Sequence, residues 1–246
     1  MSIGHCALHT DTAGNPGAPP LGLRIGGFTP LTTIDFPGHL AAVVFLQGCP
    51  WRCPYCHNPR LLSAGGQTTM SWENISHFLE QRRGLLDGVI FSGGEPTLQA
   101  RVVTAIREVK TMGFRVGLHT GGAYPERLKR LLPHLDWVGF DAKAYGDESY
   151  RRVTTAAGSW ANVTQSLRLL LDSGVDYEVR TTVYPGLDED GLLSLARFLA
   201  GCGVRYYVVQ ECRSTVAMGR PLRAPLSPEA RDCLRSLFSR FLVRGL

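Results

Sequence analysis

The chain has 246 residues, of which 44% are hydrophobic and 19% are charged, and its formal net charge is +5. This composition excludes a wholly disordered chain, and the length suits one large α/β domain or two small ones. The sequence has no apolar run of the roughly 18 to 20 residues that span a bilayer, and its start lacks the pattern of a secretory signal. We therefore expect a cytoplasmic protein with no membrane partner.

The basic residues are spread along the chain, for example at Arg82-Arg83, Arg127 and Arg151-Arg152, and form no dense block. Such spacing is typical of a solvated surface, so we expect no nucleic-acid partner. The charge permits an acidic protein partner but identifies none.

Residues 1–22 are rich in Gly, Pro, Ala, Thr and His and show no apolar period, which predicts a flexible extension before one domain over 23–246. Short apolar segments then alternate with longer segments of helical pattern, over a core of about 24–213. The predicted strands lie at 41–46, 88–91, 114–118, 137–140, 177–183 and 206–209. The predicted helices lie at about 71–86, 98–112, 124–132, 160–174, 189–201 and 228–243.

A strand followed by a helix, repeated six times, predicts a mostly parallel sheet covered by helices. A closed eight-unit barrel usually takes about 250 residues, so the six units favour an α/β fold of the partial (β/α)6 TIM-barrel type. In open and closed parallel sheets alike, the chemistry lies at the carboxyl ends of the strands. The residues that follow each strand are therefore the candidates for a site.

Three of the seven cysteines, Cys49, Cys53 and Cys56, follow the first of these strands with the spacing C-x3-C-x2-C. Buried thiols without a ligand, a zinc site and an iron–sulfur cluster are the three explanations. Zinc normally takes four ligands, and His57 is an awkward fourth because it adjoins Cys56. A [4Fe–4S] cluster on three cysteines leaves one iron open for a non-protein ligand, and we favour this explanation.

The later strands also end in candidate residues. Gly93-Gly94-Glu95-Pro96 alone reads as a tight turn, although glycines also let a backbone approach a ligand closely. Asp141 and Lys143 follow the fourth strand, where an exposed ion pair is an equal alternative. Arg180 lies in the fifth strand, and a buried arginine there can bind a carboxylate bidentately. Gln210 ends the sixth strand, where a structural role is as reasonable as a ligand contact.

With the aromatic Tyr55 before its last cysteine, the cysteine motif resembles the signature of radical S-adenosylmethionine (SAM) enzymes. The resemblance implies a [4Fe–4S] cluster on Cys49, Cys53 and Cys56, with SAM bound to the open iron through its amino and carboxylate groups. It also implies that one electron cleaves the sulfonium to give a 5′-deoxyadenosyl radical. The partial barrel of that superfamily agrees with the six units counted above.

The same resemblance assigns residues to the cofactor. Gly93 to Pro96 resemble the GGEP motif that holds the methionine amino group, and Asp141 to Lys143 resemble an Asp-x-Lys motif. In glycyl-radical activating enzymes, an Asp-Thr-Asn-Gly segment contacts SAM and, in some members, a monovalent cation. Here His119 stands at the Asp position, so we expect cofactor contact through Thr120 and doubt a cation site. The full implied set is Tyr55, His57, Gly93, Gly94, Glu95, Pro96, Thr120, Asp141, Lys143, Arg180 and Gln210.

Two further segments indicate which members of the superfamily the chain resembles. The segment 32–38, Thr-Thr-Ile-Asp-Phe-Pro-Gly, is turn chemistry on its own. Together with Cys56-His57-Asn58-Pro59 it resembles elements of pyruvate formate-lyase activating enzymes. Residues 24 to about 213 are similar to the activating proteins of anaerobic ribonucleoside-triphosphate reductase.

This resemblance implies an oxidoreductase of the EC 1.97.1 type that abstracts hydrogen from one glycine Cα of a glycyl radical enzyme. It implies an electron donor such as flavodoxin or ferredoxin. The alternatives, in falling order, are an activator of pyruvate formate-lyase or of another glycyl radical enzyme, a small-molecule radical SAM enzyme such as 7-carboxy-7-deazaguanine synthase, and a non-catalytic zinc or Fe–S protein.

Overall fold

The computed structural model describes residues 22–68, 70–212 and 226–245. These residues form one eight-stranded sheet in the order β1-β2-β3-β4-β5-β6-β7-β8, with β1 antiparallel to β2 and each later neighbouring pair parallel. The strands are β1 Ile25–Thr32, β2 Ala41–Leu46, β3 Gly88–Gly93, β4 Arg115–Thr120, β5 Trp137–Asp141, β6 Asp176–Val183, β7 Tyr206–Glu211 and β8 Arg240–Arg244. The extension predicted at 1–22 falls, except for Gly22, outside the described residues.

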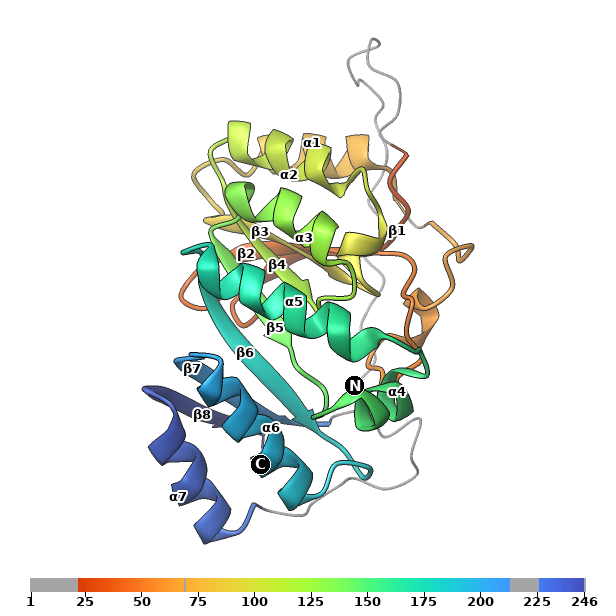
Figure 1. The fold of residues 1–246 in the computed structure, drawn as a ribbon. Helices are drawn as coiled ribbons and strands as arrows, with labels where there is room; N and C mark the ends of the chain where they lie inside the picture. The colour runs from red at the N-terminus through yellow and green to blue at the C-terminus, as the bar shows by residue number, and fades with distance from the viewer. Residues whose placement is uncertain (1–21, 69, 213–225, 246) are drawn as a thin grey trace.

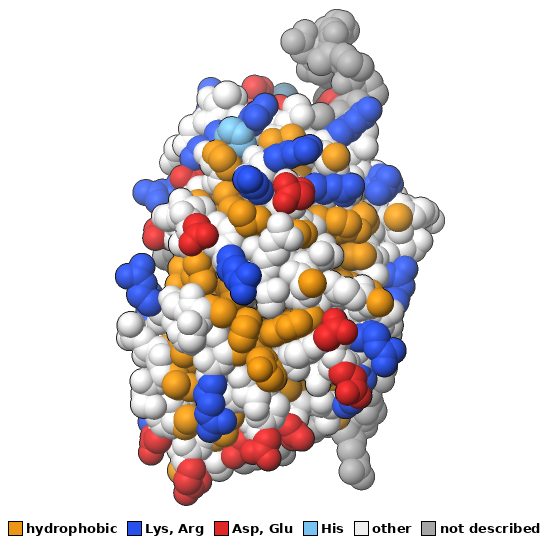
Figure 2. Space-filling view, in the orientation of Figure 1, with side chains coloured by type: hydrophobic (Ala, Val, Ile, Leu, Met, Phe, Trp, Pro, Cys, Tyr) orange, Lys and Arg blue, Asp and Glu red, His pale blue; other side chains and the backbone are white. Residues whose placement is uncertain are grey.

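The sheet is curved, and its helices gather on the outer side (Figure 1). They are α1 Trp72–Glu80, α2 Val102–Thr111, α3 Pro125–Leu131, α4 Asp147–Thr154, α5 Ser159–Asp172, α6 Glu189–Gly201 and α7 Pro228–Leu237. None of these described helices is long and apolar enough to cross a bilayer. On the helix-covered face, basic side chains are scattered with acidic ones between them (Figure 2), which agrees with the solvated surface expected from the sequence.

The strands are apolar because both faces of the sheet are covered. In β2, Ala42, Val44 and Leu46 join the large core beneath the helices, whereas Ala41 and Val43 join a small cluster on the inner face. A strand buried on both sides reads as a continuous apolar run, which is how 41–46 was predicted. Polar residues such as Glu95, Thr120 and Asp141 lie at or just after the carboxyl ends of the strands, outside this inner apolar cluster.

The six predicted parallel strands are confirmed, and the fold is the predicted α/β partial barrel. The sheet also contains β1 and β8, which the sequence did not reveal, and α4 was not predicted either. The predicted helix at 228–243 is wrong in its second half, because α7 ends at Leu237 and Arg240–Arg244 pairs with β7. The rings of Phe238 and Phe241 pack on the buried ring of Tyr207, at 4.7 and 6.2 Å between centroids, and this packing favours the strand.

Candidate functional site

A cavity of about 640 Å³ opens at the carboxyl ends of the parallel strands. It brings together every predicted site residue except Pro96, which is buried in the short 3₁₀ helix Pro96–Leu98. The sequence reasoning did not assign several other lining residues to the site, notably Asp35, Trp51, Thr182 and Arg244. The cavity therefore collects residues from β1 to β8, as expected for the active edge of a parallel sheet.

The loop after β2 carries the three cysteines and is held by its backbone. Gly48 N–H donates to Leu61 O at 2.8 Å, and Cys49 N–H donates to Leu62 O at 3.1 Å. The buried amide of Gln47 donates to the carbonyls of Arg60 and Ser63, which closes the base of the loop. Three partly buried cysteines thus lie on one braced turn.

The glycine turn after β3 packs directly on this loop. Gly94 N–H donates to Leu46 O and Glu95 N–H donates to Gly48 O, both at 2.9 Å. A Cβ atom on Gly94 would lie 2.3 Å from the carbonyl oxygen of Gly48, and Gly93 has a φ of +127°. Glycine is therefore required here so that the turn can reach the backbone of the cysteine loop, which joins the two motifs into one unit.

Glu95 is buried and linked to the end of the next strand. Its Oε1 accepts from Thr97 N at 3.1 Å and from the Thr120 hydroxyl at 2.7 Å, while Oε2 accepts from Gly121 N at 2.9 Å. The Thr120 hydroxyl in turn accepts from Gly122 N at 3.0 Å. Both predicted side chains thus hold the turns after β3 and β4 in place, and their contact with a cofactor stays a prediction.

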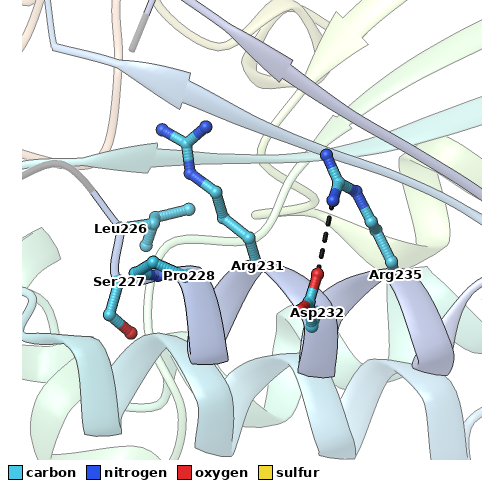
Figure 3. A pocket seen from close by; sticks show the side chains of 6 residues that line it. All are labelled: Leu226, Ser227, Pro228, Arg231, Asp232 and Arg235. Carbon is cyan, nitrogen blue, oxygen red and sulfur yellow. Dashed lines mark hydrogen bonds and ion pairs between the residues drawn. The ribbon is translucent and has the colours of Figure 1, made fainter.

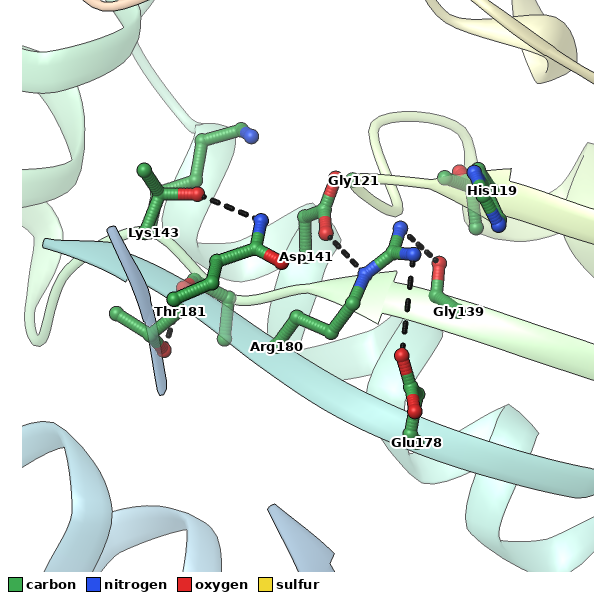
Figure 4. A network of polar contacts seen from close by, with 12 residues as sticks. His119, Gly121, Gly139, Asp141, Lys143, Glu178, Arg180 and Thr181 are labelled. Atoms are coloured by element: carbon green, nitrogen blue, oxygen red, sulfur yellow. Dashed lines mark hydrogen bonds and ion pairs between the residues drawn. The ribbon is translucent and has the colours of Figure 1, made fainter. Parts of the chain in front are cut away.

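Asp141 and Arg180 form an ion pair between β5 and β6. Arg180 Nε donates to Asp141 Oδ1 at 2.8 Å, and Figure 4 shows the guanidinium lying between Asp141 and Glu178. Burial on its own would raise the pKa of Asp141, but the charges of Arg180 and Lys143 outweigh it and hold that pKa below its usual value. The ion pair of Asp141 is therefore with Arg180, and the alternative of an exposed pair with Lys143 does not hold.

The Lys143 ammonium lies over two aromatic rings of the cysteine loop. Its Nζ is 5.6 Å from the centroid of Trp51 and 5.9 Å from that of Tyr55, which suits cation–π attraction. The Tyr55 ring packs on Tyr184 with centroids 4.5 Å apart. This arrangement places a cation at the wall of the cavity, next to the cysteines.

The two remaining predicted side chains lie at different depths in the cavity. Gln210 donates from Nε2 to the Thr182 hydroxyl at 2.9 Å, which ties β7 to β6. His57 is exposed where it lines the cavity beside Cys56.

His119 occupies the position where the resemblance has a carboxylate. Burial and the nearby Arg180 lower the pKa of His119 to about 3, so the ring is neutral at neutral pH. Its Nε2 then donates to the Asp35 carbonyl at 2.9 Å, since a carbonyl can only accept. His119 therefore fastens the segment 32–38 to β4, a role that the sequence did not reveal.

Burial changes the ionisation of two of the motif cysteines. It raises the pKa of Cys49 to about 12 and also raises that of Cys53, so both thiols are protonated at neutral pH unless a bound metal displaces their protons. In the described part of the chain, no three His, Cys, Asp or Glu side chains converge on one ion position. A [4Fe–4S] cluster does not require such convergence, because each cysteine binds a different iron.

A second pocket of about 520 Å³ lies beside α7 and is lined by Leu226, Ser227, Pro228, Arg231, Asp232 and Arg235 (Figure 3). Arg235 pairs with Asp232 on the same helix at 3.3 Å. The pocket contains no predicted site residue, so we assign it no function.

The family comparison decides the class of protein. The family model described as the Radical SAM superfamily matches residues 43–199. The chain belongs to the radical SAM superfamily. It is accordingly an enzyme, and the cofactors predicted from the sequence, a [4Fe–4S] cluster and SAM, are those of its family.

Among curated relatives, MJ1227 of Methanocaldococcus jannaschii, assigned by name to the glycyl-radical enzyme activating enzymes, is 32% identical over 197 residues, covering 76% of this chain and 79% of the relative. The pyruvate formate-lyase-activating enzyme of Clostridium pasteurianum is 29% identical, covering 68% and 71%. The pyruvate formate-lyase 1-activating enzyme of Escherichia coli K12 is 30% identical, covering 68% and 70%. The expected resemblance to the activating type is confirmed.

Solved structures agree on the fold. SuiB of Streptococcus suis bound to S-adenosylmethionine superposes with a TM-score of 0.63 at 10% identity, covering 81% of this chain and 48% of SuiB. QueE of Escherichia coli superposes with a TM-score of 0.54 at 15% identity, covering 89% and 93%. The chain spans about half the length of SuiB, and at these identities the likeness concerns the fold alone.

Proposed function

We propose that this chain activates a glycyl radical enzyme by reductive cleavage of SAM at a [4Fe–4S] cluster held by Cys49, Cys53 and Cys56. The observation that carries this proposal is the joining of the cysteine loop and the Gly93-Gly94-Glu95 turn by backbone hydrogen bonds beside one cavity. The printed names of the curated relatives support the activating type over a small-molecule radical enzyme. A non-catalytic metal protein would not need the glycine turn.

The bound cofactors supply the difficult chemistry: one electron from the reduced cluster breaks the S–C5′ bond of SAM, releasing methionine, and the hydrogen atom of a glycine Cα ends on 5′-deoxyadenosine. The chain supplies binding and orientation. The Gly93 to Pro96 turn would receive the methionine amino group, with Thr120 beside it. The charged wall formed by Asp141, Lys143 and Arg180 would face the carboxylate and the radical chamber.

We propose roles for the remaining predicted contacts as well. Tyr55 and His57 flank Cys56 on the cysteine loop, and Gln210 reaches the ribose in this proposal. We further propose that residues 23–246 act as one domain in the cytoplasm, where thiols remain reduced. A flavodoxin or a ferredoxin would supply the electron.

We propose anaerobic ribonucleoside-triphosphate reductase as the partner, because the motifs within residues 24–213 resemble those of its activating proteins. Pyruvate formate-lyase is the second candidate, since relatives that match this chain are named for activating it. Both partners use the same chemistry on a glycine, so the site alone favours neither.

The test is activation of each partner. The chain is reconstituted anaerobically, reduced, and mixed with SAM and either enzyme, and the glycyl radical is measured by EPR. We expect a radical on the anaerobic reductase, equimolar 5′-deoxyadenosine, and none of either with a Cys53→Ser variant. A radical only on pyruvate formate-lyase would identify that enzyme as the partner and refute the anaerobic reductase. SAM cleavage without a radical on either enzyme would refute both assignments.

A further inference from the structure

The inner face of β6 carries a carboxylate that the proposed mechanism does not use. Glu178 is only 1% exposed, and it lies two residues before Arg180 on the same face of the strand. Its Oε1 is 4.0 Å from Nη1 of Arg180, a distance too long for a hydrogen bond. A buried carboxylate needs closer partners than this, because an unpaired buried charge is costly.

Arg244 on β8 provides those partners. Its Nη1 donates to Glu178 Oε1 and its Nη2 to Glu178 Oε2, both at 2.8 Å, which is a bidentate pair across 66 residues of sequence. The pair reaches over β7, the strand between β6 and β8. Arg244 also lines the cavity, although it lies well beyond the residues 43–199 that match the family model.

The four charges alternate in sign in the order Arg244, Glu178, Arg180, Asp141. Arg244, Arg180 and Asp141 line the cavity, and Glu178 is buried between the two arginines. Because Arg244 satisfies both oxygens of Glu178, the guanidinium of Arg180 is left to donate its Nε to Asp141 and one Nη to the Gly139 carbonyl (Figure 4). Without Arg244, the carboxylate of Glu178 would lose its bidentate cation and keep the Tyr206 hydroxyl as a neutral partner. Arg180, the nearest remaining cation, would then be drawn toward Glu178 and away from Asp141.

We propose that Arg244 is a positioning residue of the active cavity: by occupying Glu178, it directs Arg180 to Asp141 and so sets the charged wall that meets the substrate. The last strand of the sheet is then a working part of the site rather than only an edge of the fold. The consequence for SAM binding rests on the proposed function, whereas the coupling between Arg244 and Asp141 does not.

A double-mutant cycle tests the coupling in the full-length, cluster-loaded chain without SAM. Melting temperatures are compared for Arg244→Met, Asp141→Asn and the double variant. If Arg180 no longer bonds Asp141 in Arg244→Met, adding Asp141→Asn should lower the melting temperature little further. The decrease for the double variant should therefore be smaller than the sum of the two single decreases by about 3 °C or more. Additive losses, within about 1 °C, would overturn the proposal.

Arg240→Met is the matched control, because Arg240 lies on the same strand and reaches the Arg244–Glu178 pair only through Tyr206, on whose ring it stacks at 4.3 Å. It should be additive with Asp141→Asn. Should Arg244→Met fail to fold, Arg244→Lys keeps the positive charge but loses the two-nitrogen fork that bonds both oxygens of Glu178, and a coupling of the same sign is expected. Equal coupling from Arg240→Met would mean that β8 only stabilises the sheet, and would overturn the proposal.

Equilibrium dialysis with SAM gives a readout that a purely structural role would not move. We expect Arg244→Met to raise the SAM dissociation constant about tenfold and Arg240→Met to change it less than about twofold. An unchanged constant in Arg244→Met refutes the role in the cavity. If the unsubstituted chain binds no SAM, the proposed function fails, and the thermal cycle still decides the positioning role.

Discussion

The hydroxyl of Thr120 at the end of β4 donates to the buried carboxylate of Glu95 after β3 at 2.7 Å. The same carboxylate accepts from Gly121 N, so one side chain fixes the ends of two neighbouring strands. Glu95, which the motif predicts to contact a ligand, thus also holds the turn after β4 in place. Any role of the turn in holding SAM depends on this brace.

Replacing Glu95 by Gln should therefore damage the site more than a loss of charge alone. Both oxygens of Glu95 accept from a backbone N–H group, that of Thr97 or that of Gly121. The NH2 group of a glutamine would face one of these donors in either orientation, so at least one buried hydrogen bond is lost. We expect a loss of about 2 to 4 kcal/mol in the free energy of unfolding, measured by denaturant titration, together with weaker SAM binding. Glu126→Gln, at an exposed position, should change stability by less than about 0.5 kcal/mol.

Gly94→Ala should separate the glycine turn from the cysteine loop. The new Cβ would lie 2.3 Å from Gly48 O and 2.7 Å from Gly48 C, which are backbone atoms that cannot move aside cheaply. We expect a loss of about 3 kcal/mol in stability and a reduced iron content after anaerobic reconstitution. Gly201→Ala is the control, because, apart from its chain neighbours and the nearby backbone of its own helix, no described atom lies within 4 Å of its Cβ position. Normal iron content in Gly94→Ala would contradict the joined-motif interpretation.

Six of the eight strands of the described sheet, the cysteine loop and the glycine turn could be predicted from local sequence. Strands such as β2 and β3 contain apolar runs of four to six residues, and such runs are recognisable without knowledge of the neighbours. The two edge strands were missed for different reasons. β1 contains Gly26 and Gly27 and shows little alternation, whereas the residues of β8 directly continue the helical pattern of α7.

The pairings within the site were harder to predict, because they join residues far apart in the chain. The Nε of Arg180 donates to Asp141, and nothing near Arg180 in sequence indicates that partner. The contact of Arg180 with a cofactor carboxylate stays a prediction. A signal was nevertheless present at Glu178, a charged residue inside the strand Tyr177 to Val183 that is otherwise rich in β-formers. A buried acid there requires a cation, but the sequence does not single out Arg244, which lies 66 residues away, among the 26 Lys and Arg residues.

The three motif cysteines should differ sharply from the others in iron binding. Cys53→Ser should lower the iron content from about four per chain to a small fraction, since a cluster cannot be held by two thiolates. Cys202→Ser changes a partly buried cysteine at the end of α6, which does not line the cavity, and should keep its iron. Iron and acid-labile sulfide assays, with the visible absorption of the cluster, measure both variants. A Cys53→Ser protein with full iron would refute the ligand assignment.

His119 should make the stability of the fold fall in mildly acidic solution. Its pKa is lowered from 6.5 in a free chain to about 3 in the folded state, by burial and then by Arg180, so the unfolded chain binds an extra proton between these values. Stability is therefore complete above about pH 6.5 and decreases as the pH falls, by up to about 1.4 kcal/mol per unit, until about pH 3. His119→Gln can still donate to the Asp35 carbonyl but cannot titrate, so its stability should depend less steeply on pH between 6.5 and 4.5. Denaturant titrations at several pH values measure the two slopes, and equal slopes would show that His119 is protonated as readily in the folded chain as in the unfolded one.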